Sequence, residues 1–112
     1  MAKLECTVRG TLSELIRVIL EELLNGSATA TYEDGSDFTL GNAQCAVRVY
    51  ERYSAIGGNR VSLNITLFGG DGEYSLSAIT SGGSQAMLFK INTFGEEAFL
   101  EKLEEAVRPF RV

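Results

Sequence analysis

The sequence predicts an α+β fold, in which a mostly antiparallel sheet and two helices form two layers, with both helices on one face. Segments of alternating polar and apolar residues, joined by short glycine-rich connections, fill the middle of the chain, as in antiparallel hairpins. Two segments with apolar residues at helical spacing flank them, and each begins with a capping-box pattern. The expected order is one strand, a helix, six strands and a second helix.

The length and composition indicate one globular domain. The chain has 112 residues, so we expect residues 1–112 to share a single core. Hydrophobic residues make up 45% and charged residues 22% of the chain, as in ordinary globular proteins. The net charge of −5 disfavours nucleic acid as a partner, because proteins that bind duplexes carry a basic face.

Neither secretion nor a membrane span is indicated, because no stretch is apolar over the length that either requires. The two cysteines, Cys6 and Cys45, are too few for a disulfide framework or a zinc site. We therefore expect them to be reduced thiols in a cytoplasmic protein.

The chain contains no histidine. Its absence excludes histidine-based nucleophile systems and imidazole metal sites. The glycine pairs do not form a phosphate-binding loop, because none follows the pattern of such a loop and opens a helix. No catalytic, metal or cofactor-binding residue is assigned, and catalytic activity is disfavoured without being excluded.

The N-terminal half predicts a strand, a helix and a hairpin. Residues 2–9 alternate in polarity, and Thr11 then opens a helix that should run to Asn25, with Gly26 in the left-handed position after its last turn. A hairpin is expected over residues 27–40, with its turn at Asp34 and Gly35.

Gly41 and Asn42 should form the next turn, and four further strands are expected over residues 43–91, with turns at residues 57–59, 69–72 and 81–84. Centring each pairing on its turn sets apolar residues opposite apolar residues, which supports one buried face. The predicted pairs include Phe38 with Cys45, Val49 with Leu67, Tyr53 with Leu63, Ile65 with Leu76, Leu67 with Tyr74, and Leu76 with Phe89.

A second capping box, at residues 93–96, opens the last helix, which should end near Arg108 because Pro109 follows.

The same registers place one carboxylate, Glu51, on the buried face. An unpaired buried carboxylate is costly, so Glu51 must be paired, lie at a periphery or line a cavity, unless a bulge turns it outward. The candidate pocket between sheet and helices is lined by Glu51, Tyr53 and Tyr74.

The opposite sheet face is the candidate interface, because it mixes aromatic, basic and hydroxyl side chains. A plain solvated face, self-association, or binding of another ligand or nucleic acid would each fit this mixture. The candidate interface residues are Arg48, Tyr50, Arg52, Thr66, Phe68, Ile79 and Leu88.

Three stretches, CAVRVYERYS, GGNRVSLNITLFG and SAITSGGSQAMLFKINTFGEEAFLEKL, resemble a family of small uncharacterised bacterial proteins catalogued as a domain of unknown function. The resemblance extends from about Asn25 to Leu103 and implies a bacterial, cytoplasmic, single-domain protein. It implies no activity, cofactor or site residue. The expected element order is also similar to the helix-grip plan of lipid-binding and cyclase-like domains, without the extra helix that those domains carry after the first strand.

The leading hypothesis is a non-enzymatic domain that works through a protein interface or self-association, as a homodimer formed through the open sheet face or a strand edge. The alternative is a small-ligand-binding module with a helix-grip-like pocket between sheet and helices.

Overall fold

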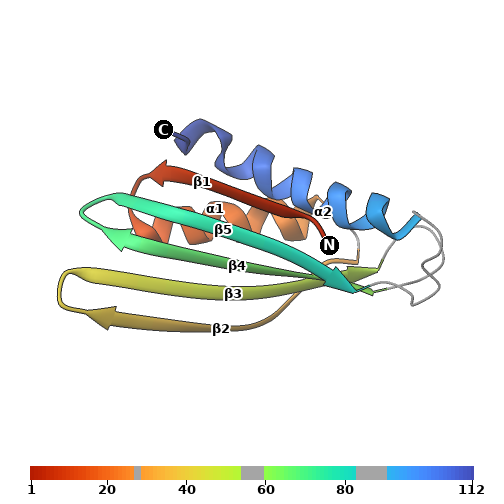
Figure 1. The fold of residues 1–112 in the computed structure, drawn as a ribbon, viewed down its shortest axis with the longest axis horizontal. Coiled ribbons are helices and arrows are strands. Elements are labelled where there is room, and N and C mark those ends of the chain that lie inside the picture. The colour runs from red at the N-terminus through yellow and green to blue at the C-terminus, as the bar shows by residue number, and fades with distance from the viewer. Residues whose placement is uncertain (27–28, 54–59, 83–90) are drawn as a thin grey trace.

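The computed structural model describes residues 1–26, 29–53, 60–82 and 91–112. It confirms an α+β fold with an antiparallel sheet that does not close into a barrel (Figure 1). The elements are β1 (Lys3–Arg9), α1 (Leu12–Asn25), β2 (Thr31–Leu40), β3 (Ala43–Tyr53), β4 (Arg60–Gly70), β5 (Glu73–Gly82), α2 (Ile91–Val107) and a 3-10 turn (Arg108–Phe110).

The strands are ordered β1-β5-β4-β3-β2, with β4 at the centre. Strands β2 to β5 follow one another along the chain and across the sheet, whereas β1 returns to the far edge beside β5. The edge of β1 is partly covered by the C-terminal residues, because the Val112 N–H donates to the Thr7 carbonyl at 3.0 Å. Among the described residues, no such contact covers the outer edge of β2.

Residues of both helices and of the sheet belong to one hydrophobic core cluster. α1 contributes every fourth residue from Leu15, which is the spacing of a single apolar stripe, and α2 contributes the aromatic ring of Phe99. From the sheet, alternate residues reach the same core, as the pleat requires. The cluster includes Leu15, Ile19, Leu23, Ala46, Tyr50, Val61, Leu63, Ile65, Leu67, Tyr74, Leu76, Ala78, Phe99, Leu103 and Val107.

The ends of α1 are capped, although not entirely as predicted. The Thr11 hydroxyl accepts a hydrogen bond from the Glu14 N–H at 3.2 Å, which confirms the predicted N-cap. Gly26 is right-handed, with φ of −84°, so the expected left-handed conformation was wrong. Its N–H instead continues the helical pattern by donating to the Glu22 carbonyl at 2.9 Å.

The last helix, α2, begins at Ile91, before the predicted start at Thr93. It ends at Val107, and Pro109 lies in the 3-10 turn that follows. The predicted end near Arg108 is therefore confirmed, because proline cannot continue the α-helical hydrogen bonds.

The predicted hairpin at Asp34 and Gly35 was wrong. Both residues lie inside β2, which is one strand with a bulge between Tyr32 and Asp34. Gly35 is required there for close packing, because a Cβ atom would lie 2.6 Å from the Tyr32 Oη and 2.8 Å from the Arg48 Cδ. The glycine therefore signals a close approach between side chain and backbone, and not a turn.

The turn at Gly41 and Asn42 was predicted correctly, and Phe38 lies opposite Cys45. The next register was wrong, because Val49 lies opposite Asn64 and not Leu67. This shift of three positions is odd, so it turns every side chain of β3 to the other face. Consequently Ala46 and Tyr50 reach the core, and Val47 and Val49 point away from it.

The register between β4 and β5 was also displaced, since Leu67 lies opposite Leu76 and not Tyr74. Ile65 is likewise opposite Ala78 instead of Leu76. This shift of two positions is even, so the core face of both strands was predicted correctly. The connecting turn consists of Asp71 and Gly72, whose φ angles of 55° and 80° suit a tight hairpin.

The sixth strand of the run was expected over residues 84–91, and its one described residue does not lie in a strand. Residues 84–90 lie outside the described residues, and Ile91 belongs to α2. The position predicted for this strand beside β5 is occupied by β1, which sets Cys6 opposite Leu76.

Candidate functional site

The side chains that point away from the core form a surface that we call the open face. The register aligns them in rows across all five strands, for example Phe38, Cys45, Phe68, Ser75 and Thr7. The two rows that follow are Ser36, Val47, Thr66, Ser77 and Glu5, and then Asp34, Val49, Asn64, Ile79 and Lys3.

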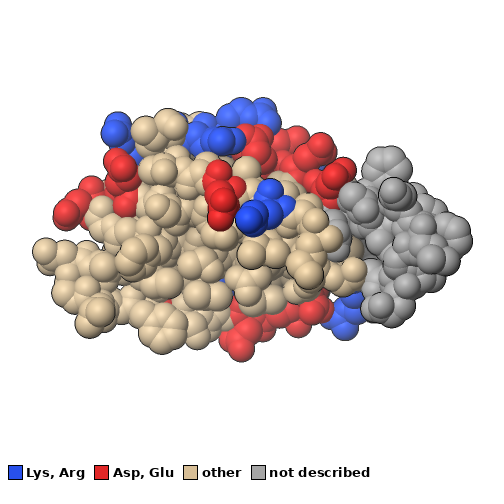
Figure 2. All heavy atoms as spheres, viewed as in Figure 1, with Lys and Arg blue, Asp and Glu red and all other residues tan. Residues whose placement is uncertain are grey.

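Within these three rows, charged side chains occur only on the edge strands. β3, β4 and β5 contribute only apolar, hydroxyl, thiol and amide groups. In the view of Figure 1, α1 lies behind the strands, and Figure 2 shows mostly uncharged atoms across the middle of this surface. Large apolar groups are exposed there: Phe38 by 61%, Phe68 by 55% and Ile79 by 41%.

The charges at the ends of the open face are paired with one another. Glu51 forms an ion pair with Arg60, and Arg9 pairs with Glu73 at 3.2 Å. The Arg60 guanidinium also lies 5.7 Å from the centre of the Tyr53 ring. The open face therefore has an uncharged centre, and each of its ends carries an ion pair.

The open face is not flat. A shallow groove of about 450 Å³ lies on the β1 side, and its floor is formed by small side chains of β5 and β1. At the opposite edge, Phe38 and Leu40 of β2 protrude into solvent. Residues at the groove include Glu5, Thr7, Thr66, Phe68, Ser75 and Ser77.

Thr66, Phe68 and Ile79 lie on the open face, and Leu88 is outside the described residues. The assignment of Arg48, Tyr50 and Arg52 to this face was wrong, because the register of β3 turns all three toward the helices. Tyr50 is buried in the core, where burial raises its pKa to about 12.

Arg52 lies over the core aromatic of α2, with its Cζ atom 4.8 Å from the centre of the Phe99 ring. Burial lowers the pKa of Arg52. The guanidinium is favourably placed against the ring, as in other cation–π contacts.

The three residues of the predicted pocket are not brought together. Glu51 and Tyr53 lie on the open side of the sheet, where both contact Arg60. The register that placed Glu51 on the buried face was wrong, whereas the alternative that Glu51 is paired agrees with its ion pair to Arg60. Tyr74 does face the helix side, and its hydroxyl donates to the Gln44 Oε1 at 2.9 Å.

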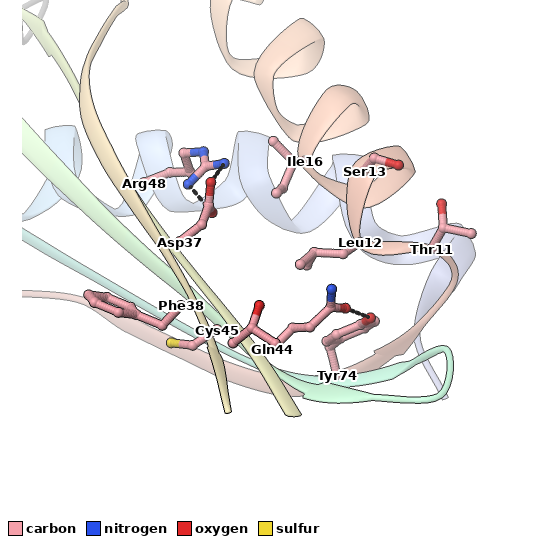
Figure 3. Close-up of a pocket in the computed structure, with 11 residues that line it drawn as sticks. Thr11, Leu12, Ser13, Ile16, Asp37, Phe38, Gln44, Cys45, Arg48 and Tyr74 are labelled. Carbon is pink, nitrogen blue, oxygen red and sulfur yellow. Dashed lines mark hydrogen bonds and ion pairs between the residues drawn. The ribbon is translucent and has the colours of Figure 1, made fainter. Parts of the chain in front are cut away.

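A different cleft, of about 550 Å³, lies between the first turn of α1 and strands β2 and β3 (Figure 3). Arg48 lines one side of it and is held by Asp37, with its Nη1 atom 2.9 Å from the Asp37 Oδ1. This hydrogen bond, supported by the charge of Asp37, raises the pKa of Arg48. Figure 3 shows Leu12, Ile16 and Gln44 directed into the cleft, and Phe38 and Cys45 turned away from it.

The cleft is electrostatically balanced, because Arg48 is neutralised by Asp37 and also donates to the Val47 carbonyl at 2.8 Å. Its other polar groups include the hydroxyls of Thr11, Ser13, Thr39 and Tyr74 and the amide of Gln44. Such groups suit a small neutral ligand. Sequence reasoning missed the cleft because the predicted register placed Arg48 on the other face.

Among the described residues, no helix is both long and apolar enough to cross a membrane. Comparisons with curated proteins and with solved structures found no match. A family model does match, and it covers residues 1–111. This chain therefore belongs to the family described as "Family of unknown function (DUF6054)", in agreement with the resemblance noted from its sequence.

Proposed function

We propose that this protein is a non-enzymatic domain that works by self-association, through the open face of its sheet. In this proposal the domain has two layers: both helices cover one face, and the other face is covered by a second copy of the chain. The absence of histidine from the sequence supports a non-enzymatic role. Two free cysteines support a reducing, cytoplasmic location.

The observation that carries the proposal is the distribution of charge on the open face. A solvated face of an antiparallel sheet normally alternates outward polar and charged residues with the inward apolar ones. Here Val47, Val49 and Phe68 occupy outward positions on β3 and β4, and no charged side chain interrupts them in the three central rows. Apolar surface of this kind, bordered by charges, is typical of protein interfaces.

The distribution of charge on the open face is compatible with a second copy of the chain as the partner. At a net charge of −5, two copies repel each other unless the contact lies where charges are absent or paired. The open face meets this condition, since its centre is uncharged and both its ends carry internal ion pairs. Homodimers with two-fold symmetry are also the commonest soluble oligomers.

The solution mass tests this proposal. We expect light scattering after size exclusion to give twice the chain mass of 12.2 kDa at high micromolar concentration, and Phe68→Glu to give the single mass. Because Phe68 is more than half exposed, this change should leave the fold intact. The matched control is Ser13→Glu, which adds the same charge at an exposed residue of α1, away from the open face, and should remain dimeric.

A strictly monomeric wild type at that concentration would end the proposal. A dimer that survives Phe68→Glu would place the contact on another surface.

The cleft beside Arg48 supports a second candidate function, the binding of a small polar molecule. Its volume of about 550 Å³ is within the range of small-molecule sites. Amide chemical shifts of Ser13, Thr39 and Gln44 would report binding from a panel of neutral metabolites such as sugars, amides and polyols. If none of these shifts changes at millimolar ligand, binding of that class at the cleft is excluded.

A further inference from the structure

We infer that two copies pack their open faces together about a two-fold axis that runs along the central strand, β4. This inference rests on the proposed self-association and specifies its geometry. The axis stacks β4 on β4 of the second copy, β3 on β5, and β2 on β1. Sheets that pack face to face with nearly aligned strands, about 10 Å apart, are a common arrangement.

The shape of the open face favours this axis. The surface protrudes at β2, through Phe38 and Leu40, and is hollow beside β1, where Thr7 and Ser75 border the groove. Phe38, Ser75 and Thr7 lie in the same row across the sheet. An axis along β4 therefore places Phe38 of each copy over the groove of the other, and this contact occurs twice.

The positions of two charged residues favour the same axis. Lys3 on β1 and Asp34 on β2 are both exposed and lie in one row, at opposite edges of the sheet. Neither has an ion-pair partner within the part of the chain that the structure describes. The axis along β4 brings Lys3 of one copy over Asp34 of the other, again twice, so that opposite charges meet at both edges.

The other axis in the plane of the interface, perpendicular to the strands, makes a poorer contact. It stacks β2 on β2 and β1 on β1, so the protruding edges meet each other and the hollow edges face each other. It also removes the pairing of Lys3 with Asp34. In the arrangement that we propose, Phe68 and Thr66 lie on the axis and contact their own copies.

Cross-linking distinguishes the two axes. The parent variant carries Cys6→Ala and Cys45→Ser, and each test variant adds one cysteine on the middle row: Val47→Cys, Thr66→Cys or Ser77→Cys. Neighbouring strands are about 4.8 Å apart, so two copies of residue 77 are offset laterally by about 10 Å across the axis. Residues 47 and 77 of different copies face each other directly. A bis-maleimide with a two-carbon spacer reaches only facing positions.

We expect Thr66→Cys chains to cross-link with themselves, Ser77→Cys chains not to, and a mixture of Val47→Cys and Ser77→Cys chains to form the mixed product. Efficient cross-linking of Ser77→Cys with itself would overturn the inference in favour of the perpendicular axis. A dimer that depends on Phe68 but gives no product at these positions would also overturn it, while self-association through the open face would stand. A monomer would end both.

A charge exchange provides a measurement that does not depend on cysteines. At low salt, Lys3→Glu should raise the dimer dissociation constant roughly tenfold, because it converts two attractive contacts into repulsive ones. Adding Asp34→Lys to the same chain should restore the wild-type constant. If the double variant is as weak as or weaker than the single one, Lys3 does not face Asp34 and the proposed axis is wrong.

Discussion

The orientation of β3 can be tested with two neighbouring residues, Tyr50 and Val49. The structure buries Tyr50 to 1% exposure and turns Val49 to the open face, half-buried by its neighbours. A register read from glycine positions alone reverses these roles. Truncating each residue to alanine therefore distinguishes the two orientations by the free energy of unfolding.

The expected cost of Tyr50→Ala is about 4 kcal/mol. Removing a large aromatic side chain from a packed core costs about 3–5 kcal/mol, because the surroundings only partly fill the cavity. Tyr50 also makes an edge-to-face contact with Tyr32, with ring centres 5.6 Å apart, and such contacts add about 0.5–1.5 kcal/mol. Val49→Ala removes little buried area in the monomer, so we expect about 1 kcal/mol or less.

Urea unfolding at low micromolar concentration, followed by circular dichroism, measures both changes on the monomer. We expect the midpoint for Tyr50→Ala to lie well below that for Val49→Ala, by at least 1 M for an m-value of about 1–3 kcal/mol/M. Tyr50→Leu serves as a milder variant if the alanine variant is unfolded in water. Equal losses, or a larger loss at Val49, would refute the register and with it the composition of the open face.

Three further predictions concern local features. Gly35→Ala should destabilise the fold by about 2 kcal/mol or more, because its Cβ would overlap the Tyr32 hydroxyl. Adding Tyr32→Phe should recover part of this loss. A Gly35→Ala variant as stable as the wild type would contradict the close packing. Thr11→Ala should lower the free energy of unfolding by about 1 kcal/mol, as measured by thermal or urea unfolding. Thr11→Ser should lower it much less, because serine keeps the capping oxygen. Equal losses for the two variants would argue against the cap. The contribution of Tyr50 to stability should be constant below pH 10 and fall between pH 10 and about 12, because the Tyr50 hydroxyl ionises at lower pH in the unfolded chain than in the folded one. The Tyr50→Phe variant should lack this fall. Parallel plots of stability against pH for the variant and the wild type would contradict the raised pKa of Tyr50.

The sequence predicted the elements better than their pairing. Period-two alternation located β1, β4 and β5, and the apolar stripes located both helices, because these patterns follow directly from burying one face. The tight turn at Gly41 also fixed the pairing of β2 with β3. Local patterns suffice wherever the connection is short.

The errors arose where glycine had a different role or a connection was longer. Gly35 was interpreted as a turn residue, whereas it accommodates the side chains of Tyr32 and Arg48 packed against it. The pair that closes the connection between β3 and β4 is Tyr53 with Arg60, and no residue type in the sequence identifies that pair. Since its odd displacement reverses β3, the same error misplaced Arg48, Tyr50 and Glu51.

The position of β1 has a consequence for the order of folding. Strands β2 to β5 can pair as local hairpins, whereas Lys3 meets Ile79 only after most of the chain has been synthesised. Closing so long a loop costs more conformational entropy than any of the hairpins. We therefore expect β1, which comes first in the order of the strands, to be the last to join the sheet. Until it joins, the edge of β5 is open to incorrect pairing with other chains.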